Sequence, residues 1–299
     1  MKYAKPPLTF EDQVDLLLSR GLLADRTKLL NRLSGVNYYR LSAYLYPFRN
    51  LGADTFKPNT SFDQVWHRYV FDRQLRLLVI DAIERVEVSV RTRLVNAFTL
   101  KHGAFGHLHK ENFTEISAKD YGQLIQNIGQ QEQSSKEIFV KHYHDRYSKK
   151  DGMPLWMSCE LMSFGNMFTF FRHIDNYMKR DIAQVYGLSA SVLESWLLTL
   201  NYIRNLCAHH ARLWNRQLAC KSLIPDKKNV PDFHDPIHVS ADYIFGVLTL
   251  LRYMLKQIAP QSHWQERLEA LLNKYPDVPL DQMGFPENWQ SCPVWSDKI

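Results

Sequence analysis

The sequence has few cysteines and no long apolar run. Its 299 residues include 4 cysteines, and no two of them form a CxxC pair. This pattern gives no sign of a disulfide framework, so we expect reduced and mostly buried thiols. The most apolar late stretch, 243–251, ends at Arg252, well short of the roughly 20 residues that cross a bilayer. The first residues lack the apolar centre of a signal peptide. We therefore expect a soluble, cytoplasmic protein.

The charge balance is only mildly basic. Thirty-seven Lys and Arg residues face 31 Asp and Glu residues, which gives a formal net charge of +6. This excess is compatible with a polyanionic partner, but an ordinary soluble protein fits it equally well. A hydrophobic content of 45% is enough for a substantial core in a chain of this length.

No stretch has a convincing strand pattern, whereas helical spacing recurs along the chain. The longest predicted helix covers about 61–101 and starts at a capping box formed by Ser61 and Gln64. We therefore expect an all-α helical bundle with long core helices and peripheral helices. Its predicted parts are an N-terminal helical unit over 1–50, a bundle over 51–275 with an insertion around 101–150, and an ordered aromatic tail over 276–299 packed on the bundle.

Three pairs of opposite charges lie four residues apart on this longest helix. This spacing places both members of a pair on one side of a helix and supports an exposed face. We expect these charges to be solvated or paired within the chain. The pairs are Asp72–Arg76, Asp81–Arg85 and Glu87–Arg91.

A second helix, predicted from Ser191 to about Trp214, changes character halfway. Its first part, 192–200, has the apolar spacing of a core helix, but polar side chains follow. Buried charge is costly unless it is paired, so such a cluster needs either a surface or a function. Asn205 and His209 are four residues apart and share one face. The polar residues are Arg204, Asn205, His209, His210, Arg212 and Asn215.

A single acidic residue interrupts the apolar helix predicted over 155–168. An isolated carboxylate in a buried helix usually has a basic partner, and Arg204 or a nearby histidine would serve Glu160. Glu160 then either orients the polar cluster or forms a merely structural ion pair.

Aromatic and histidine residues elsewhere leave further interpretations open. The tyrosine-dense segment 36–44 is explained by aromatic packing onto the bundle. It is also explained by base stacking, with a phosphate contact from Arg40. The polar helices predicted within 118–147 form a plausible RNA-facing edge. The spacing of His102, His107 and His109 suggests metal ligands, but no carboxylate or cysteine completes a set, so we expect no metal site.

The polar cluster also carries a family resemblance. The string Arg204-Asn205-Leu206-Cys207-Ala208-His209 resembles the R-N-x-x-x-H motif of the HEPN superfamily, which contains small all-α ribonucleases. Taken alone, R-x4-H is a weak motif. The longer string through Asn215 resembles, more narrowly, the Abi-like (AbiD/AbiF) abortive-infection family. Further family-like strings occur in order at 38–41, 71–76, 84–87 and 154–165.

The resemblance implies a HEPN-like bundle that cleaves RNA without a metal or other cofactor. His209 would transfer the proton, Arg204 would bind phosphate, and Asn205 would hold the imidazole or the phosphate. His210 also fits a looser form of the motif, but the spacing from Asn205 favours His209. Possible supporting residues are His210, Glu160, Arg212 and Asn215, and possible RNA-binding residues are Tyr39, Arg40 and Arg216.

The resemblance further implies partners. One motif copy per chain implies a homodimer with a composite site. RNA would be the substrate, and a small inhibitory RNA could hold the toxin silent. The alternatives are a non-cleaving RNA-binding module that docks a structured antitoxin RNA, and a bundle for protein–protein interaction. Without any such role, the polar residues would form an interhelical hydrogen-bond network.

Overall fold

The computed structural model describes residues 6–147 and 152–296, so the edges of the predicted segments 1–50, 101–150 and 276–299 lie partly outside it. The all-α prediction is confirmed, because this part of the chain contains helices and two isolated β-bridges but no strand. Its α-helices are α1 (Phe10–Ser19), α2 (Arg26–Gly35), α3 (Tyr38–Leu45), α4 (Phe62–His102), α5 (Ala118–Ser134), α6 (Ile138–Arg146), α7 (Leu155–Leu161), α8 (Phe164–His173), α9 (Asn176–Gln184), α10 (Ala190–Ala208), α11 (Ile244–Ile258) and α12 (Trp264–Lys274).

Helix α4 is the axis of the molecule. It has 41 residues and is therefore about 60 Å long at 1.5 Å per residue. The predicted capping box is present, since the Ser61 side chain accepts from the Gln64 amide and the Gln64 side chain accepts from the Ser61 amide. Helices α3, α7, α8, α9, α10, α11 and α12 all pack against α4.

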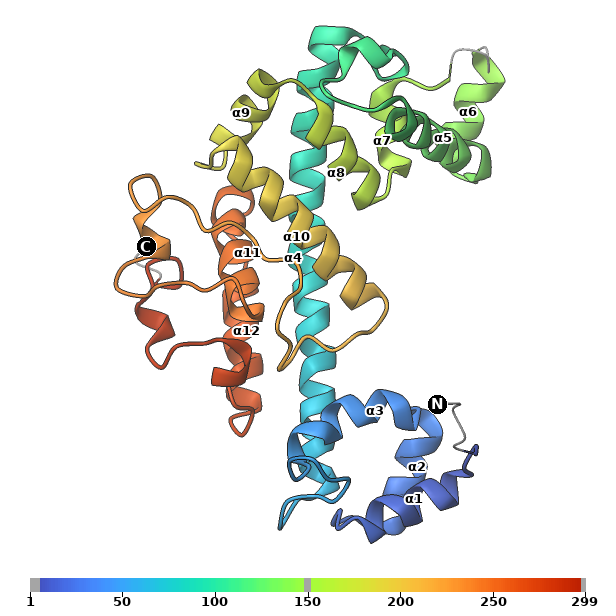
Figure 1. Cartoon of the computed structure of the whole chain (residues 1–299). Coiled ribbons are helices and arrows are strands. Elements are labelled where there is room, and N and C mark those ends of the chain that lie inside the picture. The colour runs from blue at the N-terminus through green and yellow to red at the C-terminus, as the bar shows by residue number, and fades with distance from the viewer. Residues whose placement is uncertain (1–5, 148–151, 297–299) are drawn as a thin grey trace.

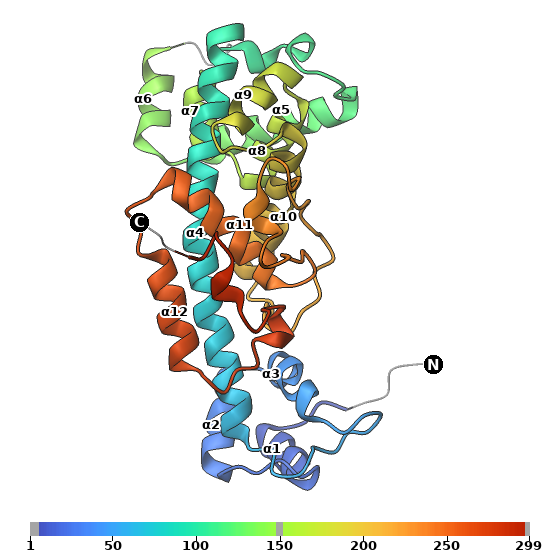
Figure 2. The ribbon, with the colours of Figure 1, turned by 90° about the vertical axis from the view of Figure 1, so that its left-hand side faces the viewer.

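The other helices form three groups along this axis. In Figure 1, α1–α3 surround one end of α4, α5–α9 surround the other end, and α10–α12 run beside its middle. Figure 2 shows α12 alongside α4, with the C-terminal segment returning toward α11. Trp289 and Trp295 of that segment are buried against Phe245 of α11. No helix in the two described stretches combines the length and apolar character needed to cross a membrane.

Several predicted helix boundaries are wrong, because side chains cap the helices at other positions. The helix predicted over 155–168 is two helices, because the Ser163 hydroxyl accepts from the Asn166 amide and starts α8 there. Helix α10 is capped by Ser189 rather than Ser191. Before α11, Ser240 accepts from the Asp242 amide in a local turn, and the helix itself starts at Ile244.

His107 is buried in the turn Gly106–Leu108 that follows α4. Neither ring nitrogen has a hydrogen-bond partner in the described structure. Burial, together with the smaller effect of the nearby His109 charge, lowers the pKa of His107 from 6.5 to about 4. The native turn therefore holds a neutral imidazole, whereas the unfolded chain protonates this group below about pH 6.5.

We predict that this histidine makes the fold sensitive to acid. Between pH 6.5 and 4 the unfolded state binds the extra proton, so the free energy of unfolding should fall by about 3 kcal/mol as the pH decreases. Urea denaturation at pH 7 and pH 4 measures this. His107→Leu should remove that share of the pH dependence, and His142→Leu at an exposed position should keep it. Equal pH dependence in the two variants would contradict the prediction.

Candidate functional site

The predicted motif helix ends six residues earlier than expected, at Ala208 instead of Trp214. His209 is the C-cap, and His210 has a left-handed backbone with φ of 57°. The His210 amide donates to the Cys207 carbonyl at 2.9 Å, and the Ala211 amide donates to the Leu206 carbonyl at 2.8 Å. These two bonds form a Schellman motif, in which glycine usually occupies the position of His210. The motif therefore ends in a sharp turn, here called the motif turn, 209–214.

A buried carboxylate holds the motif turn in place. Asp72 of α4 is fully buried, and its Oδ1 accepts from the Trp214 amide at 2.7 Å and from the Leu213 amide at 3.1 Å. Its Oδ2 accepts from the Tyr44 hydroxyl of α3 at 2.6 Å and forms an ion pair with Arg76. Asp72 therefore joins α3, α4 and the motif turn. The predicted Asp72–Arg76 pair is present, but its predicted exposure is wrong, because both residues lie in the core.

The contacts of Asp72 shift the pKa values of the ionisable groups around it. Burial raises the pKa of the Asp72 carboxyl, and Arg76, the Tyr44 hydroxyl and the two backbone amides oppose that shift. Burial and the Asp72 charge raise the pKa of Tyr44, so its phenol remains a donor. The desolvation cost of the carboxylate is thus offset by several charge-assisted hydrogen bonds.

Four arginines donate to backbone carbonyls around the motif turn, and one of them, Arg76, donates to the Ala211 carbonyl at 3.4 Å. Arg40 donates to the His210 carbonyl at 2.6 Å, and Arg212 donates to the Ala43 carbonyl of α3 at 2.9 Å. Arg216 donates to the Arg212 carbonyl at 2.6 Å. Burial and the neighbouring Arg216 lower the pKa of Arg212. The turn is consequently surrounded by positive charge that backbone contacts hold in position.

The candidate catalytic residues lie together at the end of α10. Arg204, Asn205, His209 and His210 are all exposed there. The predicted i, i+4 relation persists in the backbone, since the His209 amide donates to the Asn205 carbonyl at 3.0 Å. Arg212 and Asn215 do not continue the same helical face, because α10 has already ended before both of them. Asn215 is half-buried with φ of 48°.

The two candidate RNA-binding residues of α3 differ in exposure and contacts. Tyr39 is 84% exposed, so its ring is open to solvent. Arg40 is also exposed, although one of its nitrogens donates to the motif turn. The structure therefore places α3 beside the motif turn.

Glu160 does not have the predicted buried position. It is exposed on α7 and accepts a weak hydrogen bond from the Cys159 thiol, so the expected pairing with Arg204 or a motif histidine is wrong. The carboxylate that lies within electrostatic range of Arg204 is Glu87 of α4. Burial raises the pKa of Glu87, and the charges of Arg91 and Arg204 oppose this shift.

Arg91 links this carboxylate to the start of α8. It forms an ion pair with Glu87 and donates to the Met162 carbonyl at 3.1 Å. A Cβ added to Gly165 of α8 would lie 3.8 Å from the Asn201 side chain of α10. Segments distant in sequence thus meet near Arg204.

Sequence reasoning missed Asp72 as the residue that holds the site. A usable signal was present, because Asp72 lies seven residues after Val65 and seven before Val79, both of which are buried on the same side of α4. Helical spacing alone therefore assigned Asp72 to the core face. Across residues 6–147 and 152–296, no group of three or more His, Cys, Asp or Glu side chains could hold a metal ion.

Comparison with known families gives a match over the site. A sequence model of the family described as "Abi-like protein" matches residues 31–215, which is more than half of the chain. The matched segment contains α3, α4, α10 and the motif turn, and therefore every member of the Asp72 network. No curated protein and no solved structure matches the chain.

We predict that Asp72→Asn destabilises the fold by about 3–5 kcal/mol, because it leaves Arg76 buried without its charged partner. Urea denaturation measures the loss, and hydrogen exchange should show faster exchange of the Leu213 and Trp214 amides. The matched control is Asp63→Asn on the same helix. Its exposed pair with Lys28 should contribute at most about 1 kcal/mol. Equal losses in the two variants would show that the turn does not depend on Asp72.

We predict that His210→Gly stabilises the protein by about 1 kcal/mol, because glycine adopts the left-handed conformation without a Cβ clash. His209→Gly is the matched control, since its φ of −86° is ordinary and glycine should bring no gain there. Urea denaturation of the two variants and wild type checks this. A His210→Gly protein less stable than wild type would contradict the assigned turn.

Proposed function

The chain belongs to the Abi-like family, and from this premise we propose that it is an abortive-infection protein of phage defence that acts as a metal-independent endoribonuclease of the HEPN type. One observation carries the proposal: Arg204, Asn205 and His209 are exposed together at the end of α10. The turn that follows them has backbone amides held by the buried Asp72. Acid–base catalysis requires reactive side chains that the fold holds in fixed positions.

RNA carries its own nucleophile, the 2′-hydroxyl. His209 would take the proton from this hydroxyl or give one to the leaving 5′-oxygen, because imidazole exchanges protons near neutral pH. Arg204 would bind the phosphate oxygens with its planar fork and stabilise the developing charge. Asn205 would hold the imidazole or the phosphate by a hydrogen bond. The products would be a 2′,3′-cyclic phosphate and a 5′-hydroxyl.

The surroundings of the motif turn suit an RNA backbone. Arg40 and Arg216 add positive charge beside the turn, and their contacts with backbone carbonyls limit the freedom that binding would otherwise remove. The exposed Tyr39 ring offers a stacking surface for an unpaired base. His210 is the second candidate for proton transfer, but its main structural feature is the left-handed backbone that shapes the turn.

A second copy of the chain would complete the site in this proposal. Leu77 and Val88 of α4 are 57% and 53% exposed, and their separation of three helical turns places them on one side of the helix. Glu87, which interacts with Arg204, lies next to Val88. Asp81 and the exposed Glu84 lie between these two apolar side chains, so the proposed homodimer contact would be mixed, apolar and charged. Light scattering at the concentration used for cleavage tests it, and a monomer that cleaves RNA would contradict a shared site.

We predict that purified protein cleaves total RNA and tRNA in EDTA and leaves 5′-hydroxyl ends. Arg204→Ala and His209→Ala should each lower the rate by about 100-fold or more, because each removes a group that acts on the transition state. His210→Gly should remain active, since it preserves the turn. His142→Ala on α6 is the control for loss of an exposed histidine. Gel analysis and end-labelling of the products measure these outcomes.

The same samples separate the alternatives. If wild type binds RNA in a salt-sensitive manner but does not cleave it, the protein is a non-cleaving module that docks a structured RNA, such as a small antitoxin RNA. If His210→Gly is inactive and His209→Ala is active, His210 is the catalytic histidine. RNA binding without salt dependence, or no RNA binding at all, would reject both RNA functions and favour a protein partner.

A further inference from the structure

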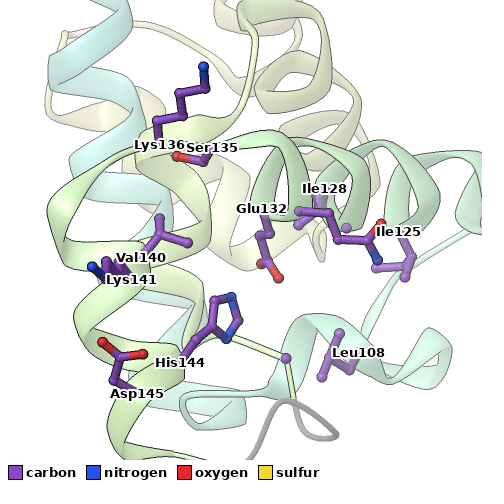
Figure 3. Close-up of a pocket in the computed structure, with 13 residues that line it drawn as sticks. Leu108, Ile125, Ile128, Glu132, Ser135, Lys136, Val140, Lys141, His144 and Asp145 are labelled. Atoms are coloured by element: carbon purple, nitrogen blue, oxygen red, sulfur yellow. The ribbon is translucent and has the colours of Figure 1, made fainter.

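A pocket of about 880 Å³ lies between α5 and α6, in the group of helices around α7. Figure 3 shows that side chains from both helices and from the turn after α4 point toward it. Part of the space exists because residue 129 is a glycine: a Cβ added there would meet no atom within 4 Å. The apolar lining consists of Leu108, Ile125, Ile128 and Val140.

Two titratable side chains converge on this apolar space. The Glu132 carboxylate and the His144 ring point into the pocket from opposite helices (Figure 3). The buried Ser158 hydroxyl of α7 donates to Glu132 Oε1 at 2.6 Å, which orients the carboxylate and leaves Oε2 and a second lone pair of Oε1 for a ligand. The Nδ1 atom of His144 is buried and has no hydrogen-bond partner among the described residues. Polar groups arranged in this way on apolar walls are typical of a small-molecule site.

The chemistry of the lining limits the ligand. A carboxylate only accepts hydrogen bonds, so it selects a ligand edge with N–H donors. The charged lining also includes Lys136 and Lys141, which are exposed and form no ion pair with a described residue, and Asp145. A neutral flat base with two adjacent N–H donors, attached to a phosphate, satisfies the carboxylate, the apolar walls and the lysines together.

Guanine is the base that fits these conditions. Its N1–H and N2–H₂ groups donate side by side, as a carboxylate requires, whereas adenine places an acceptor nitrogen next to its amino group. We propose that the pocket between α5 and α6 binds a guanine nucleotide, with Glu132 accepting from the base edge and Lys136 or Lys141 near the phosphate. The nucleotide is either free or an unpaired guanosine of an RNA.

Burial supports this assignment of Glu132. Desolvation raises the pKa of the Glu132 carboxyl, and the Ser158 hydroxyl and the His144 charge oppose the shift. A ligand with two N–H donors would stabilise the charged form and would offset part of that desolvation. The site is separate from the motif turn, which lies toward the α3 end of α4 (Figure 1).

Calorimetric titration of the full chain with GMP and with AMP tests the proposal. GMP should bind at least about tenfold more tightly than AMP, and Glu132→Gln should remove this preference, since one bidentate pair is worth roughly that factor. The matched control is Glu137→Gln, an exposed carboxylate on the α5–α6 connection that does not line the pocket. Equal affinity for both nucleotides, or tighter binding of the cation agmatine, would overturn the proposal.

A second pair of variants leaves the polar groups of the pocket unchanged. One variant fills the pocket and the other is its control. Gly129→Phe places a ring in the open space and should abolish GMP binding. Gly122→Phe adds the same ring on the same helix, also in open space, but outside the pocket lining, and should bind normally. Both variants should retain wild-type melting behaviour. GMP binding that survives Gly129→Phe would overturn the site.

Short RNAs distinguish the source of the nucleotide. An RNA with one unpaired guanosine and its adenosine counterpart are titrated into wild type and into Glu132→Gln. Guanosine-dependent RNA binding that requires Glu132, without binding of GMP, would assign the pocket to RNA, and binding of GMP alone would assign it to the free nucleotide. If neither the guanosine RNA nor GMP binds, the proposal is overturned. That result would not bear on the proposed cleavage at the motif turn.

Discussion

The buried Asp72 carboxylate is the interaction on which the rest of the site depends. It lies 28 residues from Tyr44 and 141 residues from Leu213 in sequence, yet it bonds to both. A fully buried charge is tolerated only when its lone pairs are occupied, and here two amides, a phenol and a guanidinium occupy them. If one donor were missing, fewer hydrogen bonds would offset the desolvation of the Asp72 carboxylate. This mutual requirement fixes the position of the motif turn relative to α3 and α4.

A fixed turn explains how a helix end can present reactive side chains. Helix α10 stops at Ala208, so His209 and His210 project from a C-cap and a left-handed residue instead of a regular helical face. The left-handed conformation of a residue with a Cβ costs about 1 kcal/mol or more, and the surrounding bonds must overdetermine it. Those bonds are the two Schellman contacts on one side and the Asp72 acceptors on the other. These bonds thereby hold the exposed side chains of the motif turn in fixed positions.

Local signals in the sequence predicted most of the fold, and long-range contacts account for the failures. The capping box at Ser61 and the extent of α4 follow from residues within a few positions of each other. The end of α10 does not, because 209–214 contains no glycine or proline, and a carboxylate 141 residues away accepts the freed amides. Glu160 was misplaced for a related reason, since an apolar neighbourhood in sequence says nothing about which face an interrupted helix exposes.

Long-range contacts along α4 also connect the pocket between α5 and α6 with the motif. Arg91 has two partners, the Glu87 carboxylate and the Met162 carbonyl at the end of α7. Glu87 interacts with Arg204 of the motif, and α7 carries Ser158, the hydroxyl that orients Glu132 in the pocket. Arg91 therefore joins the end of α7 to the carboxylate that interacts with Arg204. Arg91 contributes the directional bonds of this connection, whereas Glu87 and Arg204 interact through their charges, so the connection depends on the position of one guanidinium.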